Sequence, residues 1–226
     1  MYYKDFVHAG ANLSAEKRER LKAINEDLSL LETQFAKNVL SDSNDLAIVV
    51  DSEAELSGLT PSQIAAAKSA ADARGLSGKW LITMVNFTGH PLLASLENRS
   101  LRQRIMENSL AKGNRNNAHD TKGIAKKMAY LRAERAALFG RRTHAEYVTS
   151  MQTSGSPENV HAMLSKIAPN ALRNAKREGE ELQRAIQDQG EEFLLQSWDW
   201  DFFAEKVRKE KYEIDSNALK PYFELD

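Results

Sequence analysis

The sequence predicts a mainly α-helical protein, a multi-helix array with long helices and at most a small β-hairpin. Apolar residues recur at spacings of three and four along most of the chain, which is the periodicity of one helix face. Helix start and stop signals bracket these stretches, whereas only two short segments have the composition of strands. Hydrophobic residues make up 42% of the chain, which is enough to build a globular core.

The first long helix is predicted to begin near Ser14, because serine is a favoured residue at helix N-termini. One apolar stripe follows, and the polar residues 41–44 indicate where the helix ends. The stripe consists of Leu21, Ile24, Leu28, Leu31 and Phe35.

Residues 45–50 and 80–85 are short apolar segments with polar flanks, and we expect them to pair as a small hairpin. Between them, Thr60 and Gln63 have the spacing of a capping box, with Pro61 at the first helical position. The helix that starts there would end near Gly75.

Further helices are predicted over residues 90–96, 99–112 and about 118–139, and the second and third are followed by Gly113 and Gly140. Another long helix opens at Pro157 and would end near Gly190. An interior proline removes a helix hydrogen bond, so Pro169 predicts a kink or break near Ala168. The apolar face of this helix includes Val160, Leu164, Ile167, Leu172, Leu182 and Ile186.

A last helix carries Trp200, Phe203 and Val207 on one side. The aromatic residues 198–203 (WDWDFF) have helical spacing, which favours a place in the core over a ligand platform. Residues 1–226 are interpreted as one helical, non-catalytic segment, with a subdivision expected near 113–117 or 151–156.

The composition excludes several classes of protein. The chain has no cysteine, which rules out disulfides and thiol chemistry and suits a reducing compartment, so we expect a cytoplasmic protein. It has no apolar run long enough to cross a membrane, and the net charge of −1 predicts no general attraction to nucleic acid. Residues 112–142 are locally basic, but these charges are expected to form a solvated face or to pair with acidic helices.

No catalytic or metal-ligating residue is predicted, and no substrate-binding residue is identified. The chain contains no H-E-x-x-H, no phosphate-binding loop and no nucleophile elbow. Two partial metal motifs occur, His144 with Glu146 and Glu158 with His161, and only the second pair shares a helix face. A lone pair of this kind lacks the further ligands that a metal site needs, so both are interpreted as surface pairs.

Two stretches near the end of the chain are the most distinctive, residues 198–212 (WDWDFFAEKVRKEKY) and 219–225 (LKPYFEL). Residues 6–14, 98–102 and 131–140 support them. Together these stretches resemble the peptidyl-dipeptidase branch of the thimet-oligopeptidase family of zinc peptidases. The resemblance extends over nearly the whole chain.

The resemblance implies a larger, all-helical parent peptidase. Its zinc ligands lie on an H-E-x-x-H helix and a later glutamate, beyond the point that matches residue 226. In that family, zinc and a glutamate base activate water, and this branch releases dipeptides from the C-terminus of short peptides. This chain would then be an inactive fragment without zinc, forming part of the wall of the substrate channel.

The expected partners are short peptides, through the parent enzyme, and the missing catalytic half. Self-association is also expected, because residues 198–203 and 221–223 would be left exposed. The alternative interpretation is a stand-alone helical interaction module without catalysis. The reading frame beyond Asp226 would distinguish the two.

Overall fold

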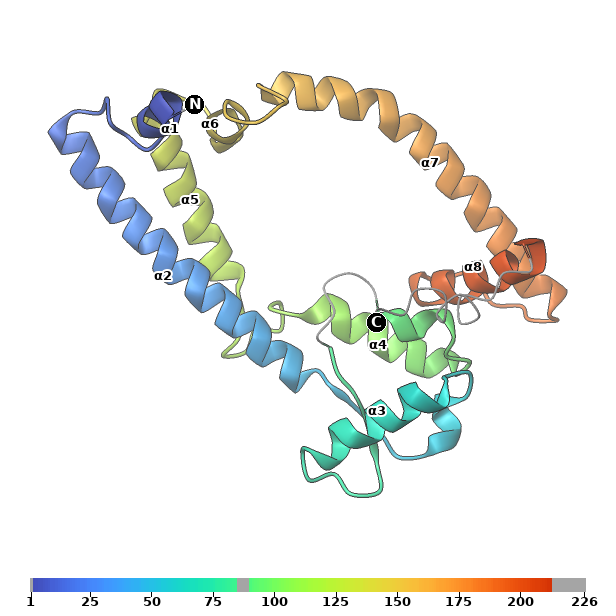
Figure 1. The fold of residues 1–226 in the computed structure, drawn as a ribbon. Helices are drawn as coiled ribbons and strands as arrows, with labels where there is room; N and C mark the ends of the chain where they lie inside the picture. The colour runs from blue at the N-terminus through green and yellow to red at the C-terminus, as the bar shows by residue number, and fades with distance from the viewer. Residues whose placement is uncertain (1, 85–89, 213–226) are drawn as a thin grey trace, which may run out of the picture. The chain divides into compact units, whose positions relative to one another are not determined.

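A computed structural model describes residues 2–84 and 90–212 (Figure 1). The chain divides into two compact units: unit 1 comprises residues 1–42 and 113–172, and unit 2 comprises residues 43–112 and 173–226. Helices dominate both units, which confirms the predicted mainly α fold. No helix in the described part is long and apolar enough to cross a membrane. A subdivision near 113–117 or 151–156 stays a prediction.

Unit 1 is built around a pair of long helices that lie side by side, α2 and α5 (Figure 1). Ile24 and Leu28 of α2 pack on Met128 and Leu131 of α5, which confirms the predicted stripe. Ser14 caps α2, since its Oγ accepts from the Lys17 amide at 3.3 Å. The helices of this unit are α1 (Tyr2–His8), α2 (Ala15–Asp45), α5 (Lys122–Leu138), α6 (His144–Thr149) and the first part of α7 (Pro157–Asp188).

Unit 2 contains the two predicted strands, which pair antiparallel with Val49 opposite Leu81. The capping box at the start of α3 is also confirmed, because the Thr60 amide donates to Gln63 Oε1 at 2.8 Å and the Gln63 amide to Thr60 Oγ1 at 3.3 Å. The elements are β1 (Ile48–Val50), the 3₁₀ helix η1 (Glu53–Leu56), α3 (Pro61–Asp72), β2 (Trp80–Ile82), the 3₁₀ helix η2 (Pro91–Ala94), α4 (Arg99–Ala111), the end of α7 and α8 (Ser197–Tyr212).

Several boundaries differ from those predicted. The helix expected over residues 90–96 is only the short η2, because the His90 side chain caps the turn by accepting from the Leu92 amide. The helix expected from about residue 118 begins at Lys122, since the Asp120 side chain holds a preceding turn by accepting from the Asn116 amide at 2.8 Å. Helices α1, α6 and η1 were not predicted, and Val85 lies outside the described residues.

Pro169 does not interrupt α7, so of the kink or break predicted near Ala168 the break is wrong, whereas the kink stays a prediction. A proline in a helix interior removes one amide donor and leaves a carbonyl four residues earlier without its helix partner. Residues 161–178 are all exposed, so water can bind that carbonyl and the helix can continue on both sides.

The aromatic segment 198–203 lies on α8 and contributes to the core of unit 2. Phe202 and Phe203 are only 8% and 2% exposed and pack against Leu182 and Ile186 near the end of α7. The predicted core role is therefore confirmed. The expectation that this segment supplies exposed apolar surface is wrong for these two rings, because α8 turns them onto α7. Residues 221–223 lie outside the described residues.

Candidate functional site

The histidines do not converge on a metal site. His90 is buried and fixed by two backbone contacts, with Nε2 3.0 Å from the Thr83 carbonyl oxygen, and burial lowers its pKa. His144 is half-buried, and burial and then the nearby Arg135 lower its pKa. Across residues 2–84 and 90–212, no group of three or more histidines and carboxylates could hold a metal ion. The described residues therefore do not fit a zinc site.

The two partial metal motifs are held by other contacts. The Glu146 carboxylate accepts hydrogen bonds from the Arg142 amide at 2.9 Å and from Arg142 Nε at 2.6 Å. Glu158 lies 3.7 Å from the same guanidinium, and His161 is exposed on α7. Arg142 thus lies beside the carboxylate of each motif.

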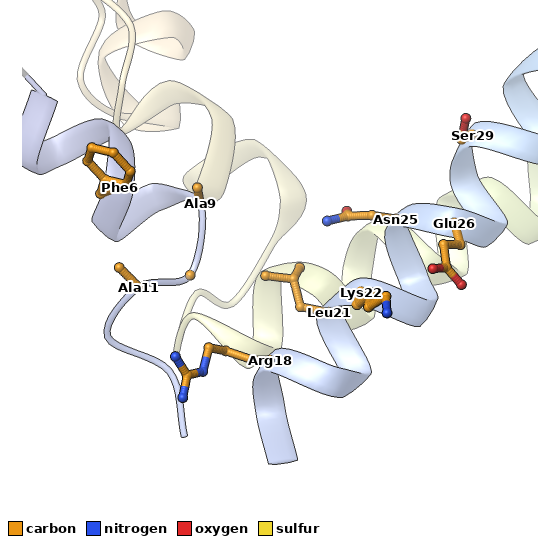
Figure 2. A pocket seen from close by; sticks show the side chains of 10 residues that line it. Phe6, Ala9, Ala11, Arg18, Leu21, Lys22, Asn25, Glu26 and Ser29 are labelled. Atoms are coloured by element: carbon orange, nitrogen blue, oxygen red, sulfur yellow. The ribbon is translucent and has the colours of Figure 1, made fainter. Parts of the chain in front are cut away.

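One pocket of unit 1 lies between the end of α1 with its following turn and one face of α2 (Figure 2). Its volume is about 640 Å³, which is within the usual range of small-molecule sites. Phe6, Ala9, Ala11 and Leu21 supply the apolar lining. The polar residues that line it are Arg18, Lys22, Asn25, Glu26 and Ser29. This pocket can accept an apolar side chain with a charged or polar neighbour.

Gly10 sets the shape of this pocket. Its φ is +103°, and a Cβ placed there would lie 2.7 Å from Leu21 Cδ2. A glycine allows the turn after α1 to approach α2 closely, because it has no side chain and tolerates positive φ. The close approach brings Ala9 and Ala11 opposite Leu21 in Figure 2.

A second pocket of unit 1, of about 300 Å³, lies beside Tyr147. His8 stacks on the Tyr147 ring at 4.0 Å between centroids, and the Tyr147 hydroxyl donates to the His8 carbonyl at 3.0 Å. Burial raises the pKa of Tyr147, which keeps the hydroxyl neutral and able to donate. Lys4 and Arg141 also line the pocket, so it combines aromatic surface with positive charge.

Several of the basic residues in 112–142 form ion pairs within unit 1. Arg132 pairs with Glu32 at 3.1 Å and Arg115 with Asp42 at 2.7 Å, and both acidic residues lie on α2. The prediction that these charges pair with acidic helices is thus confirmed for these two arginines.

Asp42 is a fully buried carboxylate that organises the turn after residue 112. It accepts from the Gly113 amide at 2.7 Å, from Arg115 Nη1 at 2.7 Å and from Asn117 Nδ2 at 3.1 Å. Burial alone would raise the pKa of Asp42, but the hydrogen bonds from Asn117, Gly113 and Arg115 outweigh it and hold the pKa below its usual value.

Because folding lowers the pKa of Asp42, its ionised form stabilises unit 1 above the ordinary aspartate pKa of about 3.9, and this contribution is lost as the pH falls through the folded pKa. We expect Asp42→Asn to lower the free energy of unfolding by about 1.5–3 kcal/mol at pH 7. The difference between parent and variant should shrink below about pH 4. Urea denaturation followed by circular dichroism at pH 7 and pH 3 measures it, and an equal difference at both would contradict an ionised Asp42.

The most buried charges of unit 2 join α4 to α8. Asp199 is fully buried and accepts from Arg99 Nη2 at 2.8 Å and from Arg102 Nη2 at 2.9 Å. The guanidinium carbons lie 3.9 Å from the Phe193 ring centre for Arg99 and 4.1 Å from that of Phe202 for Arg102. Two cations thus share one carboxylate and two aromatic faces.

Arg102 also forms hydrogen bonds with the backbone that precedes α4. It donates through Nη1 to the Leu96 and Glu97 carbonyls at 2.8 and 3.0 Å, and through Nε to the Trp198 carbonyl at 3.1 Å. Burial lowers the pKa of Arg102, and the Asp199 hydrogen bond opposes this. The side chain therefore acts as a structural link between two segments that are far apart in sequence.

A family model described as peptidase family M3 matches residues 92–226, more than half of the chain. The chain belongs to peptidase family M3. The match includes α4, α7 and α8, and therefore the whole Asp199 cluster.

Known relatives agree with the M3 assignment. The chain is 35% identical to a dipeptidyl carboxypeptidase of Escherichia coli over 99% of its length, and this covers 33% of that protein. It is 31% identical to a probable cytosolic oligopeptidase A of Arabidopsis thaliana, covering 98% of the chain and 32% of the relative. It is 30% identical to an oligopeptidase A of Haemophilus influenzae, covering 97% of the chain and 33% of the relative. The chain thus spans about a third of the length of these relatives.

The M3 chain also has surface features that the sequence alone did not reveal. The two pockets described above include residues of α1, whose few residues show no helical periodicity, and the second one joins His8 to Tyr147, 139 positions later. Within α1, only residues 6–8 belong to a stretch that is distinctive in the sequence, and that stretch is distinctive for its resemblance to the family. No pattern in the sequence connects these distant residues.

Proposed function

We propose that this chain is the helical, non-catalytic part of a longer zinc-dependent oligopeptidase of family M3, which releases dipeptides from the C-terminus of short peptides. The observation that carries the proposal is the near-complete coverage of this chain by a dipeptidyl carboxypeptidase about three times its length. The relatives called oligopeptidase A are less similar, which favours the peptidyl-dipeptidase branch.

In this proposal, zinc and the catalytic groups are supplied by residues outside this chain, because the described residues do not fit a zinc site. When bound in the longer protein, zinc would supply Lewis-acid chemistry for peptide hydrolysis. The contribution of this chain would be to form part of the channel wall, where the apolar pocket beside Leu21 and the cationic pocket beside Tyr147 could contact a short peptide. A cytoplasmic location is part of the proposal and is supported by the absence of cysteine.

The chain alone is expected to hold no stoichiometric zinc and to release no dipeptide. The product of the complete reading frame should bind zinc and release dipeptides. Elemental analysis after dialysis measures the metal, and mass spectrometry of a short peptide with a free C-terminus measures dipeptide release. The same peptide with an amidated C-terminus is the matched control substrate. One tightly held zinc per copy of the 226-residue chain would contradict the proposal.

A stand-alone helical interaction module is the second candidate, and the exposed apolar side chains of α7 favour it. The two candidates differ in the reading frame that encodes the chain. A frame that continues into H-E-x-x-H supports the peptidase, and a natural stop after Asp226 supports the module.

A further inference from the structure

Helix α7 carries an apolar stripe that is covered at one end and exposed along the rest. At the covered end, Leu182 and Ile186 are buried against the aromatic rings of α8. Leu164 precedes Leu182 by about five full helical turns and so lies on the same face, yet it is 49% exposed. The stripe therefore continues beyond the contact that buries its end.

The exposed part of the stripe is made of branched and small apolar residues. Leu164 and Ile167 are 49% and 55% exposed, and Met163 and Leu172 beside them are 55% and 59% exposed. The other exposed members of the stripe are Ala168, Ala171 and Ala175. Burying each Leu or Ile is worth roughly 1.5–3 kcal/mol, so leaving the stripe in water forgoes a large stabilisation. Contiguous exposed apolar surface of this kind marks an interaction site.

The composition of α7 indicates what covers the stripe. Alanines between larger side chains let two helices approach closely, and the covered end of the same stripe already packs on a helix. Lys166, Arg173 and Arg177 lie on the opposite face of α7, and Lys176 lies at one edge of the stripe, one turn after Leu172. On a helix that lies in a lipid surface, cations would instead flank the apolar face on both sides. The stripe therefore fits an apolar protein surface.

We infer that the exposed stripe of α7 packs against helices from the remaining two thirds of the peptidase chain. This inference rests on the proposed function, since relatives matched over nearly all of this chain are about three times longer. The family match includes all of α7, so the helix is part of the peptidase architecture and not an addition to it. The interface that begins at α8 would then continue along α7.

The chain has no cysteine, so a single introduced thiol reports on one position. Ile167→Cys places it on the stripe, and Lys166→Cys places it one residue away on the opposite face as a matched control. In the dilute 226-residue chain, both cysteines should react with a maleimide at similar rates. In the product of the complete reading frame, Ile167→Cys should react at least about tenfold more slowly, whereas Lys166→Cys should keep its rate. Mass spectrometry of the labelled peptide measures each rate.

Ala171→Cys is a second stripe variant with a smaller change of volume, and it covers the case in which Ile167→Cys prevents folding of the longer protein. Equal labelling of stripe and control cysteines in the longer protein would overturn the inference. Protection of the stripe cysteine that appears in the isolated chain only at high concentration would assign the stripe to a second copy, and would also overturn the inference. A reading frame that adds nothing to the chain would overturn the inference as well.

Peptide hydrolysis by the unsubstituted longer protein is measured separately. Protection of the stripe without hydrolysis would support the packing and contradict the proposed activity. Hydrolysis with a fully reactive stripe cysteine would contradict the packing alone.

Discussion

Asp199→Ala is expected to lower the free energy of unfolding of unit 2 by about 3–5 kcal/mol, because it removes the counter-charge from a buried cation. Arg102 is 2% exposed and would keep its charge with no carboxylate beside it. The variant also loses the contact from Arg99 and the hydrogen bond that Asp199 accepts from the Gln196 amide at the start of α8. We expect the joint between α4 and α8 to weaken most.

Glu205→Ala is the matched control for this prediction. Glu205 is also on α8 and also accepts twice from one arginine, Arg208, at 2.7 Å, but both side chains are partly exposed. Its loss should cost less than about 1 kcal/mol. Urea denaturation followed by tryptophan fluorescence measures both variants, since Trp80, Trp198 and Trp200 all lie in unit 2. Equal losses for the two variants would show that burial does not set the strength of the Asp199 cluster.

Gly58→Ala is expected to destabilise unit 2 by about 3–5 kcal/mol, through a collision with backbone as well as strain in its own backbone. Gly58 has a φ of +90°, and a Cβ there would lie 2.0 Å from the Ser95 carbonyl oxygen. That oxygen cannot rotate away as a flexible side chain could. The loop is also held by a hydrogen bond from the Glu97 amide to the Ser57 carbonyl at 2.9 Å.

Gly75→Ala separates the two causes. Gly75 has a similar φ of +71°, but no atom lies within 4 Å of the position that an added methyl group would take. Only the backbone strain of about 1–2 kcal/mol should therefore remain. Both variants can be followed by tryptophan fluorescence in urea. A Gly58→Ala variant as stable as Gly75→Ala would mean that the loop at residues 57–59 moves away from Ser95 without cost.

Local signals predicted most of the helices correctly. The Thr60 capping box and the stripe of α2 were both readable because each depends on residues within a few positions of one another. The prediction of a kink or break at Pro169 failed in one respect, because the helix is not broken there. The cost of an interior proline depends on whether water can reach the freed carbonyl, which the local pattern does not report.

The sequence by itself determined the helical class, the main helix boundaries and the resemblance to a zinc peptidase family, because periodicity, caps and motifs are local properties of the chain. Only the tertiary structure decided which apolar faces are covered. Leu164 and Leu182 lie on one stripe of one helix, and only Leu182 is buried. The tertiary structure likewise decided that Asp42 and Asp199 are buried among their partners. Burial depends on what packs against a residue from distant parts of the chain, and periodicity carries no information about that partner.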